Sequence, residues 1–133
     1  MTTLRINHMS LQVRDLARSS DFYQRVLKLP EVECLAARPN IRWFGIGAEH
    51  TVHLIEGDFA DTKVTRSTHL CITTSDFEAT IRHVESTGTA YCDAAGNSGK
   101  IHTRADGVHS IYFQDPDGYW IEVSEEFEAA KQL

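Results

Sequence analysis

A chain of 133 residues can bury a hydrophobic core without disulfides, as one domain or as two fused half-domains. Its formal net charge of −6 disfavours nucleic acids and anionic membrane surfaces as partners, and its three cysteines lack the Cys-x-x-Cys spacing of a thiolate zinc site. There is no apolar signal core at the start and no apolar run long enough to span a membrane, so we expect a soluble, cytoplasmic protein.

The first half of the chain predicts a strand, a helix and three further strands. Residues 6–13 alternate between apolar and polar side chains, as in a half-buried strand. A broad apolar stripe over residues 16–27, followed by Pro30, predicts a helix. Further strands are expected at residues 31–35, 41–46 and 51–56.

After a linker expected at residues 57–66, the second half repeats this order. Residues 67–74 alternate like a strand, and residues 77–84 carry apolar side chains at helical spacing. Ser75 and Glu78 resemble a capping box at the start of this helix. The remaining strands are expected at residues 90–93, 108–114 and 119–124, with a turn at residues 115–118 joining the last two.

The two halves are related by an internal repeat. When the opening strand of one half is placed over that of the other, His8 falls on His69 and Asp15 falls on Asp76 at the same offset. Such a repeat is hard to obtain by accident. We therefore expect one α+β domain over residues 1–133, built from two tandem βαβββ modules at about residues 1–60 and 66–126.

Four ligand-capable side chains stand at matching places in the two modules. His8 and His69 fall on the strand face that points away from the helix. His53 and Glu122 each stand between two apolar residues on the last strand of their module. A carboxylate in such surroundings is costly unless it is paired or bound to a cation.

This pattern predicts one divalent metal bound by His8, His69 and Glu122. His53 is either a fourth ligand or a pocket histidine that only polarises substrate or water. Imidazole and carboxylate ligands suit Fe, Zn, Ni, Co or Mn, and the sequence does not choose among these metals.

The motifs at the two ends of the chain point to a family. They are Ile6-x-His8-x-x-Leu11-x-Val13-x-Asp15-Leu16 with Asp21-Phe22-Tyr23-x-x-Val26-Leu27, and Phe113-x-Asp115-Pro116-Asp117-Gly118-x-x-x-Glu122. The pattern resembles the vicinal oxygen chelate proteins, which include glyoxalase I, fosfomycin-resistance thiol transferases, extradiol dioxygenases and bleomycin-resistance proteins. The resemblance covers nearly the whole chain and implies paired βαβββ modules that form a barrel-like cleft, often in a homodimer.

The resemblance also implies a chemistry. The metal would chelate vicinal oxygens of a small oxygenated substrate and stabilise an enolate or oxyanion, as in a glyoxalase-type lyase or isomerase, with Glu122 and His53 as the catalytic residues. His53 stands where bacterial glyoxalase I carries glutamate. Ser10 and Tyr112 match hydroxyl positions near the phosphonate in the fosfomycin enzymes, and Trp43 is expected in the pocket wall. The alternatives are an Fe(II) extradiol-type dioxygenase, a fosfomycin-type thiol transferase and a non-catalytic drug-binding protein.

Overall fold

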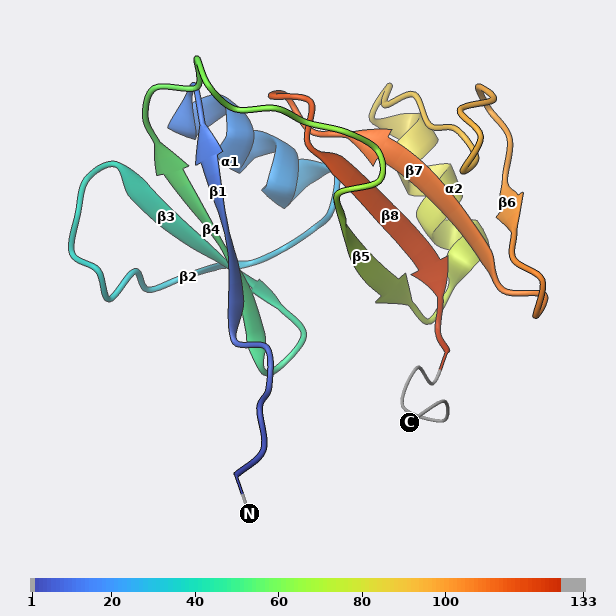
Figure 1. The fold of residues 1–133 in the computed structure, drawn as a ribbon, viewed down its shortest axis with the longest axis horizontal. Helices are drawn as coiled ribbons and strands as arrows, with labels where there is room; N and C mark the ends of the chain where they lie inside the picture. Colours follow the sequence, from blue (N-terminus) through green and yellow to red (C-terminus); the bar gives the residue numbers. More distant parts are fainter. Residues whose placement is uncertain (1, 128–133) are drawn as a thin grey trace. The chain divides into compact units, whose positions relative to one another are not determined.

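A computed structural model describes residues 2–127 of the chain, which divides into two compact units with the boundary between Lys63 and Val64 (Figure 1). Each unit contains one helix and four strands in the order βαβββ. The predicted α+β class and the two tandem modules are therefore confirmed. Neither helix within residues 2–127 has the length and hydrophobicity needed to cross a membrane.

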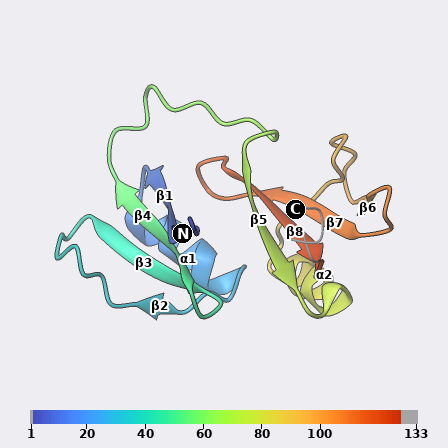
Figure 2. The ribbon, with the colours of Figure 1, turned by 60° about the horizontal axis from the view of Figure 1, so that its bottom comes forward.

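Unit 1 is a four-stranded sheet with one helix packed on it. The strand order is β1-β4-β3-β2, in which β1 and β4 run parallel and the other neighbours run antiparallel. Helix α1 packs against β3 and β4 (Figure 2). The elements are β1 (His8–Val13), α1 (Leu16–Arg25), β2 (Glu31–Val32), β3 (Ile41–Ile46) and β4 (His50–Glu56).

The core of unit 1 separates the two faces of its sheet. Tyr23 of α1, Phe44 of β3 and Leu54 of β4 are fully buried. In β1 the alternation is clear, because Leu11 and Val13 are buried whereas the intervening polar residues are exposed. The polar residues of β1 therefore lie on the face opposite the helix, as the sequence predicts.

Unit 2 repeats this topology. The strand order is β5-β8-β7-β6, again with the first and last strands of the module parallel. Val84 of α2 and Ile111, Phe113 and Ile121 of the sheet are almost completely buried. The elements are β5 (His69–Thr74), α2 (Phe77–Ser86), β6 (His102–Thr103), β7 (His109–Gln114) and β8 (Trp120–Glu125).

Two local predictions in unit 2 are wrong. The second strand of the module is β6, at residues 102–103, rather than residues 90–93, where Cys92 forms only isolated bridges to Ser98 and Tyr112. Short edge strands have little hydrophobic pattern, which is why the sequence placed this strand incorrectly. His102, which lies outside the predicted strands, is on β6.

The N-terminal cap of α2 also differs from the prediction. The N-cap of α2 is Asp76, whose Oδ1 accepts a hydrogen bond of 3.0 Å from the backbone N–H of Ala79, so Ser75 does not form the expected capping box. Asp15 caps α1 in the same way, with Arg18 as the donor. The repeated aspartate therefore has a structural role in both modules.

The turn between β7 and β8 is as predicted. Asp115 Oδ1 accepts hydrogen bonds of 2.9 Å from the backbone N–H groups of Asp117 and Tyr119. Gly118 has a φ of +91°, a conformation that favours glycine. This turn fixes the start of β8 and hence the position of Glu122. The three cysteines are free thiols, in agreement with their spacing.

Candidate metal centre

Unit 1 places its two candidate ligands side by side on the face opposite α1. The imidazole rings of His8 and His53 are stacked, with centroids 4.1 Å apart and planes 9° apart. Trp43 stacks on the other side of His53, with ring centroids 4.1 Å apart and planes 2° apart. Ser10 on β1 and Trp43 on β3 are the strand partners of His53. These two predicted pocket residues and His53 therefore lie side by side in one row across the sheet.

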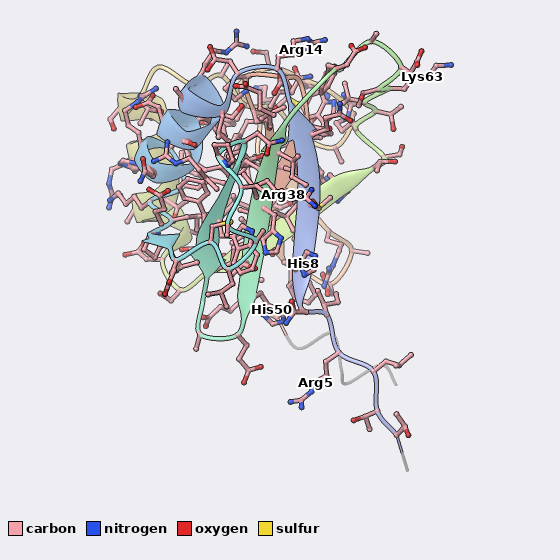
Figure 3. The ribbon with its side chains drawn as sticks, turned by 90° about the vertical axis from the view of Figure 1, so that its left-hand side faces the viewer. Arg5, His8, Arg14, Arg38, His50 and Lys63 are labelled. Carbon is pink, nitrogen blue, oxygen red and sulfur yellow. The ribbon has the colours of Figure 1, made fainter. Side chains whose placement is uncertain are left out.

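His8 presents one free ring nitrogen. Its Nδ1 lies 2.8 Å from Oδ1 of Asn7, an atom that can only accept a hydrogen bond. Nδ1 therefore carries the proton, and the lone pair of His8 is on Nε2. Figure 3 shows His8 on β1, between Arg5, which precedes the strand, and Arg14, which follows it. This exposed edge position suits a residue that binds an external ion.

His53 differs from His8 in its surroundings. Its Nε2 lies 2.9 Å from the hydroxyl of Thr51, so this nitrogen already has a partner. Burial lowers the pKa of His53 below its usual value of 6.5, and the neighbouring His8 lowers it further. The ring is therefore neutral at neutral pH and able to accept a proton.

Unit 2 forms an equivalent row across its sheet. Cys71, Glu122 and Tyr112 are strand partners on β5, β8 and β7. The Tyr112 hydroxyl donates a hydrogen bond to Oε1 of Glu122. The other carboxylate oxygen, Oε2, lies 4.0 Å from Nε2 of His69. The predicted partners His69 and Glu122 are thus brought together, and the predicted pocket residue Tyr112 holds the carboxylate.

His69 has the same tautomer as His8. Its Nδ1 lies 2.7 Å from the backbone carbonyl oxygen of Arg66, which can only accept. The lone pair is therefore on Nε2, the atom that faces Glu122. Metal-binding histidines commonly have the second ring nitrogen fixed by an oxygen acceptor in this way.

The donor atoms of unit 2 fit a divalent metal. Two atoms bound to one metal at about 2.1 Å lie about 3.0 to 3.4 Å apart in octahedral or tetrahedral geometry. The observed 4.0 Å between His69 Nε2 and Glu122 Oε2 needs only a small side-chain rotation to reach this range. Desolvation and a hydrogen bond to Glu122 raise the pKa of Cys71 to about 12, so this thiol is protonated in the metal-free protein.

Each unit brings two of the predicted ligands together, and a single metal shared by His8, His53, His69 and Glu122 stays a prediction. Within residues 2–127, neither unit alone gathers three His, Cys, Asp or Glu side chains into a metal site. Sequence reasoning missed the oxygen acceptors that fix the two histidine rings. Asn7 could have been found as a polar neighbour of His8, whereas a backbone carbonyl leaves no signal in the sequence.

Comparisons with known proteins agree with this architecture. Residues 5–123 match the family model of the Glyoxalase/Bleomycin resistance protein/Dioxygenase superfamily. The uncharacterized protein YwbC of Bacillus subtilis is 27% identical over 124 residues, which cover 89% of this chain and 94% of YwbC.

Solved structures give the same result. An integron cassette protein of V. cholerae is 27% identical with a TM-score of 0.71, covering 96% of this chain and 98% of its own. The fosfomycin resistance protein FosX of Listeria monocytogenes is 19% identical with a TM-score of 0.75, covering 99% and 100%, and shows the same fold. The chain is a member of the glyoxalase/bleomycin resistance protein/dioxygenase superfamily.

Proposed function

We propose that the chain is a divalent-metal-dependent enzyme of the glyoxalase type, a lyase or isomerase that acts on a small oxygenated substrate. One observation carries the proposal. His8 and His69, at equivalent positions in two modules, both have Nδ1 on an oxygen acceptor and therefore present Nε2 as a donor. Membership of the superfamily, which includes enzymes of this kind, supports the same conclusion.

We assign metal binding to His8, His69 and Glu122. Fe, Zn, Ni, Co or Mn would suit these nitrogen and oxygen donors. The metal would polarise vicinal oxygens of the substrate and stabilise the negative charge that develops on them. The chain itself fixes the orientation of the donors through Asn7, the Arg66 carbonyl and Tyr112.

We assign His53 to proton transfer rather than to metal binding. Its ring is stacked face to face on His8, and with Nε2 bonded to the Thr51 hydroxyl the lone pair for a proton would be on Nδ1. The in-plane lone pairs of stacked rings run side by side and do not converge on one ion. A neutral imidazole with a lowered pKa can accept a proton from the substrate, which is the role of a general base.

The remaining predicted site residues would form the substrate pocket. Trp43 and Ser10 lie next to His53 and supply an aromatic face and a hydroxyl. Burial and the hydrogen bond to Glu122 raise the pKa of Tyr112 to about 12, so its phenol stays protonated and continues to donate. We also propose a homodimer as the working assembly, which light scattering in solution would test.

A set of two histidines and one carboxylate also favours two other activities. One is a fosfomycin-type thiol transferase, whose hydroxyl positions Ser10 and Tyr112 match. The other is an Fe(II) ring-cleavage dioxygenase, because this donor set is typical of such iron sites. A protein that binds a drug without turnover is the third alternative.

A substrate panel separates these activities. Metal-free protein is loaded in turn with each candidate metal and given a thiol conjugate of a 2-oxoaldehyde, fosfomycin with a thiol, or catechols with oxygen. We expect isomerase turnover that Glu122→Gln abolishes and Glu126→Gln, an exposed control on the same segment, preserves. Turnover that survives Glu122→Gln, or ligand binding without turnover across the panel, would contradict the proposal.

A further inference from the structure

A pocket of about 330 Å³ lies in unit 2. One of its walls is Tyr112, whose hydroxyl is bonded to Glu122, so the pocket reaches the row that carries the carboxylate. Its size is at the lower end of the range for small-molecule sites, and most of its lining is apolar. The lining residues are Thr89, Ala90, Tyr91, Cys92, Ser98, Tyr112, Phe113, Gln114 and Trp120.

The guanidinium of Arg66 is held next to Trp120, one of the residues that line this pocket. Its Nε donates a hydrogen bond of 3.1 Å to the carbonyl of Ala94, and its carbon lies 5.3 Å from the centre of the Trp120 ring. Gly96 leaves room for it, because a Cβ at that position would lie only 3.1 Å from Nη1. The side chain is therefore fixed in place before any ligand binds, which reduces the entropy cost of recognition.

The charge of Arg66 has no carboxylate partner within residues 2–127. By contrast, Arg25, Arg42 and Arg104 each pair with an aspartate or glutamate. Burial raises the pKa of Cys92, a residue that lines the pocket, and the positive charge of Arg66 partly offsets this rise. The electrostatic field of Arg66 therefore reaches the pocket. A fixed guanidinium beside a mostly apolar pocket is suited to an oxyanion, which its planar fork can bind through two hydrogen bonds.

Arg66 also links the pocket to the proposed metal ligands. Its backbone carbonyl accepts the hydrogen bond from Nδ1 of His69, while its side chain reaches Ala94 and Trp120. The same residue therefore orients one metal ligand and flanks the pocket. A molecule that chelates metal next to Glu122 can place its other end in this pocket.

We propose that the pocket of unit 2 binds the body of a small organic acid, apolar or aromatic, whose carboxylate or phosphonate group pairs with Arg66. Trp120 and Cys92 would contact the body, and the terminal nitrogens Nη1 and Nη2 of the guanidinium would contact the acid group. That this acid is the substrate rests on the proposed function. Binding of the acid itself needs no metal and can be measured separately.

The test uses benzoate as the anionic probe and benzamide as its neutral counterpart. Metal-free full-length protein labelled with ¹⁵N is titrated with each probe, and the indole N–H signal of Trp120 reports binding, with Trp43→Phe used to assign it. The variants are Arg66→Gln and, as a matched control, the exposed Arg82→Gln of α2. A hydrogen-bonded ion pair predicts that Arg66→Gln weakens benzoate binding by about tenfold to a hundredfold.

Three results support the proposal together: weaker benzoate binding in Arg66→Gln, unchanged binding in Arg82→Gln, and benzamide binding that is insensitive to both. Arg66→Lys, which keeps the charge but loses the fork, should fall between wild type and Arg66→Gln. Benzoate that leaves the Trp120 signal unmoved, or binds Arg66→Gln as well as wild type, would overturn it.

Metal content measured on the same samples separates this inference from the proposed function. Because His69 is held by the backbone carbonyl of residue 66, Arg66→Gln should retain metal content equal to that of the wild type. Arg66-dependent benzoate binding in a protein that takes up no metal would sustain the pocket and refute the metal enzyme. Metal uptake without benzoate binding would refute the acid-binding pocket and leave the proposed metal enzyme standing.

Discussion

The hydroxyl of Tyr112 should set the affinity of the protein for metal. Tyr112→Phe keeps the buried ring and removes only the hydrogen bond to Oε1 of Glu122. Hydrogen bonds to charged groups contribute about 1.5 to 3 kcal/mol, and about 1.4 kcal/mol corresponds to a tenfold change in binding. We therefore expect the variant to bind metal about tenfold to a hundredfold more weakly, as measured by competition with a chelator.

A matched control is available in the same unit. Tyr91 donates a hydrogen bond of 2.8 Å to Glu85, which is not a proposed ligand, so Tyr91→Phe should leave metal affinity unchanged. Thermal unfolding of both metal-free variants checks that each remains folded. The reasoning would be refuted if Tyr112→Phe bound metal within about twofold of wild type, or if both variants lost affinity equally.

Three further predictions concern the histidine pair and the helix caps. In metal-free protein the pKa of His53, measured by NMR, should lie below 6.5 and should rise towards that value in His8→Asn; an unchanged pKa in the variant would argue against the stack. Because the unfolded chain takes up the proton more readily, the stabilising effect of neutral His53 is present above pH 6.5 and is lost as the pH falls through its folded pKa. Asn7→Ala should weaken metal binding about tenfold by chelator competition without lowering the unfolding temperature, and equal affinity would show that Asn7 does not orient His8. Asp76→Ala should lower the free energy of unfolding in urea by about 1 kcal/mol, and no change would remove the capping role.

The fold followed from the sequence wherever a pattern was long and periodic. The alternation in β1 and the stripe of α1 predicted both elements and the faces they bury. The failure at β6 has a physical cause, because a two-residue edge strand is determined by pairing with β7 rather than by its own residues. The capping error arose because neighbouring Ser75 and Asp76 are both good caps, and only the backbone geometry distinguishes them.

The sequence suggested the residues of the candidate site but not the contacts that support them. The repeat suggested His8 and His69, and the family resemblance suggested Tyr112, which the structure pairs with Glu122. The ring orientation of His69 depends on a carbonyl of residue 66, which any amino acid would provide. The proposed separation of roles between His53 and His8 likewise depends on the stacking of their rings, which has no sequence signature.

Elemental analysis of freshly purified protein tests the central claim most directly. If His8, His69 and Glu122 hold a metal, the wild-type protein should contain a stoichiometric divalent metal that His69→Asn and Glu122→Gln each remove. A wild-type protein that carries no metal and takes none up from solution, or variants that retain the full content, would contradict the account.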